Sequence, residues 1–133
     1  MLSSGTNNNF GLDLAVIGNG RTAALLEPAS RLVWWCHPRF DGDPVFCRLL
    51  AGDEEKGFSD VVLDGMADFS SDYERNTAVV TTVLTNNENA SIRITDFAPR
   101  FRNYDRIFRP PQLIRIIEPI SGLPRITIRV RPT

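Results

Sequence analysis

Histidine, cysteine and lysine are scarce in this sequence of 133 residues. One histidine, His37, and two cysteines, Cys36 and Cys47, cannot supply the four His and Cys ligands of a structural zinc site. We therefore expect no bound metal and no cofactor. Two cysteines in an ordinary globular composition do not form a disulfide framework, which predicts a reduced, cytoplasmic protein.

The chain also lacks a surplus of positive charge and a long apolar run. Lys and Arg number 15 against 16 Asp and Glu, a net charge of -1 that argues against general nucleic-acid binding. No run approaches the ~20 apolar residues of a membrane span, so no membrane contact is expected. Residues 1–10 are polar and have neither the basic start nor the apolar centre of a secretion signal. We expect residues 1–11 to form a flexible polar N-terminus.

No helical periodicity of ordinary length is present, and strand patterns take its place. We expect strands at residues 12–17, 22–26, 32–36, 58–63, 76–85, 90–97, 113–118 and 126–131, one helical turn within 45–50, and loops at 51–57, 64–71 and 99–111. Many short strands separated by turn residues predict an all-β fold, an antiparallel β-sandwich over residues 12–133. The last predicted strand ends two residues before the sequence does, which leaves a sheet edge that a further segment would normally cover. We expect the sandwich to be incomplete at this C-terminal end.

The segment Gly18-Asn19-Gly20-Arg21-Thr22-Ala23 matches the G-x-G-x-x-A pattern of dinucleotide-binding loops. Asp41 lies near the expected distance for a ribose-binding acid. That interpretation needs a helix to begin at the turn, and Pro28 leaves no room for one. A tight primed hairpin turn at Asn19-Gly20 is therefore favoured.

Two other patterns that suggest catalysis have simpler explanations. Asp53, Glu54 and Glu55 stand in a polar loop with no apolar surroundings to raise a pKa, so a solvated loop is favoured over acid–base chemistry. Cys36 and His37 are neighbours on a strand and point to opposite faces, so they cannot form a nucleophilic pair. We predict no catalytic residue.

Arginines and aromatic residues alternate in the predicted loop 99–111. The arginines are Arg100, Arg102, Arg106 and Arg109, and the aromatic residues are Phe101, Tyr104 and Phe108. Single-stranded nucleic acid can be bound by such a pattern, but the neutral overall charge opposes that. Packing of the aromatic rings on a neighbouring domain, with the arginines paired to its acids, is favoured.

The segment Trp34-Trp35-Cys36-His37-Pro38-Arg39-Phe40-Asp41 combines large flat rings with paired polar groups. Of two consecutive tryptophans on a strand, one must face away from the core. Its ring lies under a covering loop, forms a sugar platform, or anchors an interface. The residue types alone leave these alternatives open. Trp34, Trp35, Arg39, Phe40 and Asp41 are the candidates for a substrate rim or a domain interface.

Two motifs together carry a family resemblance. Residues 14–25, with Gly18-Asn19-Gly20-Arg21, followed by residues 34–41, resemble the trehalase-like N-terminal domain of bacterial family 15 glycoside hydrolases, the glucoamylase-like and trehalase-like enzymes. The later motifs Thr95-Asp96-Phe97-Ala98-Pro99 and Arg129-Val130-Arg131-Pro132 follow in the order of that family. Where the commoner family form has Asp-Gly and a further aspartate, this chain has Pro28-Ala29-Ser30 and Val33. That departure leaves trehalose and malto-oligosaccharides both open as the substrate.

The resemblance implies a β-sandwich that precedes a catalytic (α/α)6 barrel absent from this sequence. The barrel of these inverting α-glucoside hydrolases carries the two catalytic glutamates. It therefore implies a non-catalytic accessory domain that packs against the barrel of the same or a companion polypeptide and shapes the sugar site, with an α-glucoside as the ligand. Two alternatives are a free-standing carbohydrate-binding module and a fragment that completes its sheet by strand addition through residues 126–130.

Overall fold

The computed structural model describes residues 14–39, 41–51, 56–75 and 77–132, and nearly all regular structure in them is β. The elements are β1 (Ala15–Gly18), β2 (Ala23–Leu26), a 3-10 turn (Pro28–Ser30), β3 (Leu32–Cys36), β4 (Pro44–Phe46), α1 (Arg48–Ala51), β5 (Phe58–Leu63), β6 (Met66–Tyr73), β7 (Val80–Asn86), β8 (Ser91–Phe97), β9 (Phe101–Asn103), β10 (Arg106–Phe108), β11 (Ile114–Ser121) and β12 (Ile126–Arg131). No helix in these ranges has the length and apolar character needed to cross a membrane.

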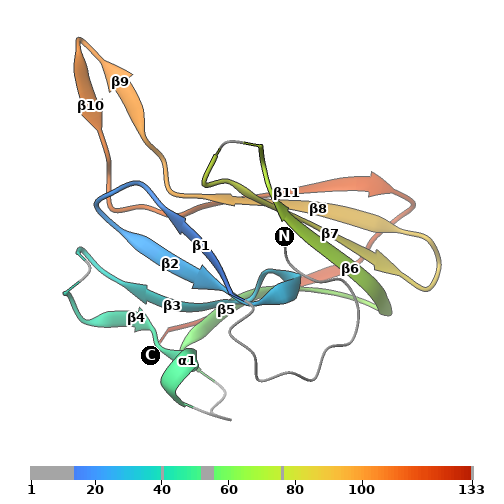
Figure 1. The fold of residues 1–133 in the computed structure, drawn as a ribbon. Coiled ribbons are helices and arrows are strands. Elements are labelled where there is room, and N and C mark those ends of the chain that lie inside the picture. The colour runs from blue at the N-terminus through green and yellow to red at the C-terminus, as the bar shows by residue number, and fades with distance from the viewer. Residues whose placement is uncertain (1–13, 40, 52–55, 76, 133) are drawn as a thin grey trace.

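The strands form two antiparallel sheets packed face to face (Figure 1). The first sheet has the order β1-β2-β3-β5-β12, with β4 paired to β3, and the second has the order β11-β8-β7-β6. The predicted antiparallel sandwich is therefore confirmed. Strands expected at 32–36, 58–63 and 126–131 match β3, β5 and β12 to the residue.

The core lies between the sheets because inward positions alternate with outward ones along each strand. On β7 the buried residues Val80, Thr82 and Leu84 alternate with half-buried neighbours. One group of buried side chains gathers around Ile17 and Leu26, and a second gathers around Leu84 and Ile94. The interior of the sandwich therefore has two apolar clusters, one around Ile17 and Leu26 and one around Leu84 and Ile94.

One side of the sandwich is tied by a bond between edge strands. The backbone N–H of Val16 on β1 donates to the hydroxyl oxygen of Tyr73 on β6 at 2.7 Å. Because β1 and β6 are edge strands of different sheets, this contact uses an N–H that the sheet leaves unpaired.

Strands β9 and β10 form a separate two-stranded hairpin that projects away from both sheets (Figure 1). We call residues 100–109 the arm. Every residue from 101 to 109 is exposed. At the tip, Tyr104 and Asp105 both have positive φ angles, 50° and 62°, as in a primed hairpin turn.

Four local expectations are wrong. Residues 64–71, expected to be a loop, mostly belong to β6, and the expected loop 99–111 contains the arm. Residues 44–46 are a strand, and the helical turn begins only at Arg48. The β1–β2 hairpin closes on Gly18 and Ala23 with four residues between them, rather than on a two-residue primed turn. Asn19 determines this wider loop, since its side-chain oxygen accepts the backbone N–H groups of Arg21 and Thr22.

Candidate functional site

Trp35 points into the core of the sandwich. Its indole Nε1–H donates to the hydroxyl oxygen of buried Thr22 at 2.7 Å. Its ring stacks against Phe46, with centroids 6.3 Å apart, and meets the His37 ring edge-on at 5.2 Å. These contacts give the ring's single N–H an acceptor and cover much of its apolar surface. Trp35 therefore packs into the interior of the sandwich from the first sheet.

Trp34 lies on the opposite, outer face of the same sheet and is half-buried. It pairs with Leu25 on β2, which pairs in turn with Val16 on β1. The three side chains form an apolar row across three strands, and Val16 at its end is exposed. Of the two tryptophans, Trp34 is the one placed to meet another surface.

Arg39 and Asp41 lie beyond β3 in the turn that leads to β4. Their side chains form an ion pair, with Arg39 Nε 3.3 Å from Asp41 Oδ1, and are 69% and 73% exposed. Gly42 closes this turn by donating its N–H to the Arg39 carbonyl at 3.0 Å. A Cβ at position 42 would lie 2.6 Å from the His37 carbonyl oxygen, so only glycine fits. Phe40, also expected in this group, lies outside the described residues, as does the acidic cluster Asp53, Glu54 and Glu55.

A buried acid that the sequence argument missed lies between the sheets. Asp96 on β8 accepts from Arg115 Nε on β11 at 2.6 Å, and Arg115 Nη2 also donates to the Ser30 carbonyl at 2.5 Å. Burial raises the pKa of Asp96 above its usual value, and the Arg115 guanidinium only partly offsets that rise. Asp96 and Arg115, with Trp35 and Phe46, line a cavity of about 190 Å³.

A second buried acid stands on the outer face of the first sheet. Asp60 accepts from Arg129 Nη2 at 2.6 Å and from Arg31 Nε at 3.3 Å. Burial by itself would raise the pKa of Asp60, but the bonds and charges of Arg129 and Arg31 outweigh it and hold the pKa below its usual value. Three guanidinium groups, those of Arg31, Arg48 and Arg129, lie 4.9–5.7 Å from the centre of the Phe58 ring beside it.

Both buried acids are thus engaged by arginines and hold strands together. In the part of the chain that the structure describes, no three His, Cys, Asp or Glu side chains gather where a metal ion would bind.

Comparison with known proteins decides the family. The sequence pattern of the family described as "Trehalase-like, N-terminal" matches residues 6–132. The chain is 33% identical over 120 residues to a protein of Thermoplasma volcanium named Trehalase, and the match covers 88% of this chain and 19% of that protein. No solved structure matches the chain.

The chain belongs to the trehalase-like N-terminal domain family.

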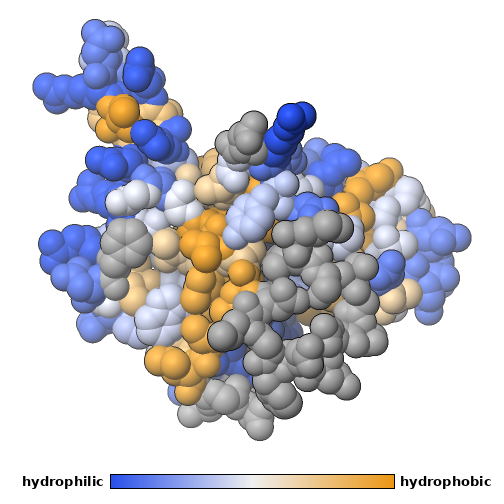
Figure 2. Space-filling view, viewed as in Figure 1, coloured by the Kyte–Doolittle hydropathy of each residue, from blue (hydrophilic) through white to orange (hydrophobic). Residues whose placement is uncertain are grey.

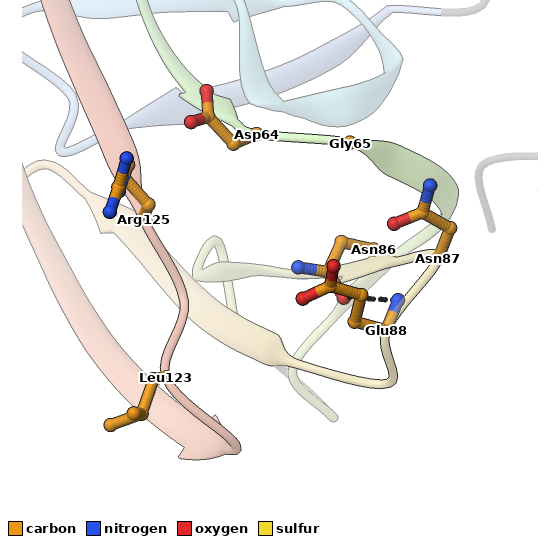
Figure 3. Close-up of a pocket in the computed structure, with 7 residues that line it drawn as sticks. All are labelled: Asp64, Gly65, Asn86, Asn87, Glu88, Leu123 and Arg125. Carbon is orange, nitrogen blue, oxygen red and sulfur yellow. Dashed lines mark hydrogen bonds between the residues drawn. The ribbon is translucent and has the colours of Figure 1, made fainter.

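Within this trehalase-like domain, a polar hollow lies at the end of the sandwich away from the arm (Figures 1 and 3). It is formed by the β5–β6 turn at Asp64 and Gly65, the β7–β8 turn, and the segment of Leu123 and Arg125. The Glu88 N–H donates to the Asn86 side-chain oxygen at 2.9 Å, a bond drawn as a dashed line in Figure 3, and this arrangement shapes the β7–β8 turn. The carboxylates of Asp64 and Glu88 lie on different turns and do not point toward one another in Figure 3. The two acids therefore do not form a common site in the hollow.

Three residues that matter here were missed by the sequence argument, namely Asn19, Asp60 and Asp96. A signal was available for Asp96, because it follows buried Ile92 and Ile94 at the inward positions of β8. An acid at such a position predicts a buried charge with a partner. No comparable signal marks Asp60, whose carboxylate is engaged by Arg31 and Arg129 from distant segments.

Proposed function

We propose that this chain is a non-catalytic accessory domain of a glucoamylase-like or trehalase-like glycoside hydrolase that acts on α-glucosides. Membership in a family of N-terminal domains, with a match to 19% of a trehalase, is the observation that carries this proposal. Its partner would be a catalytic (α/α)6 barrel, supplied by the same or a companion polypeptide in the cytoplasm.

The chemistry of the acidic residues supports a structural role. Glycoside hydrolysis uses two carboxyl groups on opposite sides of the scissile bond, one of them free to donate a proton. Asp60 and Asp96 are each held by hydrogen-bonded arginines and belong to opposite sheets. Both carboxylates serve to join strands rather than to face a substrate.

A contribution to the sugar site is the finer part of the proposal. Arg39 and Asp41 are exposed, and within the described residues their ion pair is with each other, so both offer polar atoms to a ligand at the edge of a neighbouring domain. Trp34, on the outer face of the adjacent strand, would anchor that neighbour. Trehalose and malto-oligosaccharides are the candidate ligands.

A chimeric enzyme tests the proposal. The segment of the Thermoplasma volcanium trehalase that aligns with this chain is replaced by this chain, and trehalose hydrolysis is compared with that of the same trehalase lacking the segment. We expect the chimera to be active and the truncated enzyme to be inactive or unstable. A chimera no better than the truncated enzyme would refute the accessory role.

Within the active chimera, Arg39→Ala and Asp41→Ala test the contribution to the sugar site. We expect a raised KM for trehalose with unchanged thermal stability, because the two side chains are exposed. Exposed Arg75→Ala, on the β6–β7 connection, is the control. Unchanged kinetics in both variants would remove Arg39 and Asp41 from the sugar site and leave the accessory role intact.

A further inference from the structure

The arm carries a concentration of positive charge although the chain as a whole is slightly acidic. Residues 100–109 hold four arginines and one aspartate, a net charge of +3, whereas the whole chain carries -1. Among the ion pairs found within the described residues, none involves these four arginines. All four arginines are exposed, and the Arg109 guanidinium lies close to Gly20 at the base of the arm.

The same arm exposes large apolar side chains. Phe101 is 51% exposed, Ile107 is 47% exposed, Phe108 is 41% exposed and Tyr104 at the tip is 92% exposed. The rings of Phe101 and Phe108 are paired across the two strands and stack with centroids 5.3 Å apart. Figure 2 shows this projection as mainly hydrophilic with a hydrophobic patch. A two-stranded hairpin exposed in this way is marginally stable in water and gains stability from a covering surface.

The base of the arm is held rigidly against the sandwich. The Asn19 side-chain amide donates to the carbonyl oxygens of Pro99 and Pro110, both at 2.8 Å, so one buried side chain holds both ends of the arm. Beside this base lies a groove of about 720 Å³, lined by the β1–β2 turn, residues 77–79 and the first residues of the arm. Because the base is held in place, the arm loses less conformational entropy on binding than a hairpin with a free base would.

We propose that the arm and this groove form the surface by which the domain docks onto the catalytic portion of its enzyme. The surface they fit is a protein surface with carboxylates around an apolar centre. The carboxylates would pair with Arg102 and Arg106, while the apolar centre would receive Phe101 and Phe108. Aromatic and arginine side chains are the residues most enriched at interface centres. This inference rests on the proposed function and adds the docking element and the chemistry of its partner.

The chimera described above tests the inference through trypsin cleavage after Arg102, compared with cleavage in the isolated chain. We expect the chimera to be cleaved at least about 30-fold more slowly, the factor that corresponds to a strong interface contact. The double variant Phe101→Ser/Phe108→Ser should restore rapid cleavage in the chimera. The double variant Arg102→Glu/Arg106→Glu should lower the thermal midpoint of the chimera but not that of the isolated chain. Arg125→Glu, an exposed arginine in the hollow of Figure 3, is the matched control and should change neither.

The outcomes separate the two proposals. An active chimera whose arm is cleaved as fast as in the isolated chain refutes docking through the arm and leaves the accessory role standing. An inactive chimera with a protected arm supports docking and refutes the contribution to activity.

Other occupants of the arm are tested on the isolated chain by sedimentation velocity and by titration with oligothymidylate and maltohexaose. Self-association, or binding of either probe, that is lost in Phe101→Ser/Phe108→Ser or Arg102→Glu/Arg106→Glu would assign the arm to that occupant and overturn the proposal.

Discussion

The side-chain amide of Asn19 donates to the carbonyl oxygen of Pro110 at 2.8 Å, across 91 residues of sequence. The same amide reaches Pro99, and its oxygen accepts two backbone N–H groups of the β1–β2 loop. One side chain therefore joins the first hairpin of the chain to both ends of the arm.

Replacement of Asn19 should release the arm. Asn19→Asp keeps the acceptor for the loop N–H groups but loses both donations, and it places a carboxylate beside two carbonyl oxygens. We expect a loss of roughly 1–3 kcal/mol in unfolding free energy and faster trypsin cleavage after Arg102, because two half-buried carbonyl oxygens are left without their donor. Asn87→Asp, on an exposed turn, is the control. Equal cleavage rates in Asn19→Asp and the unmodified chain would contradict this role.

The two tryptophans should differ in their effect on stability. Trp35→Phe leaves the buried Thr22 hydroxyl without its donor and should cost about 1–3 kcal/mol. Trp34→Phe changes a half-buried ring on the outer face and should cost below about 1 kcal/mol. Urea denaturation followed by far-ultraviolet circular dichroism measures both. The assignment of Trp35 to the core fails if the order is reversed.

Asp60 should contribute to the pH dependence of stability. Its pKa in the folded protein is lowered, while the unfolded value is about 3.9. The ionised form is thus favoured by folding, so its contribution is fully present above about pH 4 to 5 and is lost as the pH falls through the folded pKa. Asp60→Asn should lower the unfolding free energy at pH 7 and flatten its decline below pH ~4. Asp72→Asn, which removes an exposed carboxylate on β6, should change neither, and an unaltered acid decline in Asp60→Asn would contradict the prediction.

The thiol of Cys36 should react slowly with thiol reagents in the folded protein. Burial, with a smaller contribution from the Asp43 carboxylate, raises its pKa above the usual value, so little thiolate is present at pH 7. In a Cys47→Ser variant, which retains only Cys36, reaction with Ellman's reagent should follow the rate of opening of the fold. If the native protein reacts completely within seconds, at the same rate as in 6 M guanidinium, the prediction that Cys36 reacts slowly is wrong.

The strand positions were predictable where β-branched and apolar residues are concentrated. Strands β3, β5 and β12 are rich in such residues, and their limits follow from the sequence. Strand β6 is different. Its residues Met66–Tyr73 mix polar and apolar types without a clear strand pattern and are mostly exposed, so the pairing with β7 makes this segment a strand.

The orientation of the tryptophans was not predictable from alternation alone. Leu32 and Trp35 both face the core although they are three positions apart, an odd number that strict alternation would place on opposite faces. An irregularity in the β2–β3 pairing, between Leu25 and Leu26, accommodates this change of side. A single extra residue in one strand reverses which ring faces inward, and sequence alternation gives no indication of it.

The pairing of β5 with β12 has a consequence for how the domain is made. Strand β5 ends at Leu63, yet the strand that completes its edge and the guanidinium group that reaches Asp60 come from residues 126–131, with Arg129 lying 69 positions further along the chain. During synthesis, the second sheet is therefore complete before the first one can close. A nascent chain paused in this interval exposes β5 with an open edge and Asp60 without Arg129, and an open strand edge is a site at which chains aggregate.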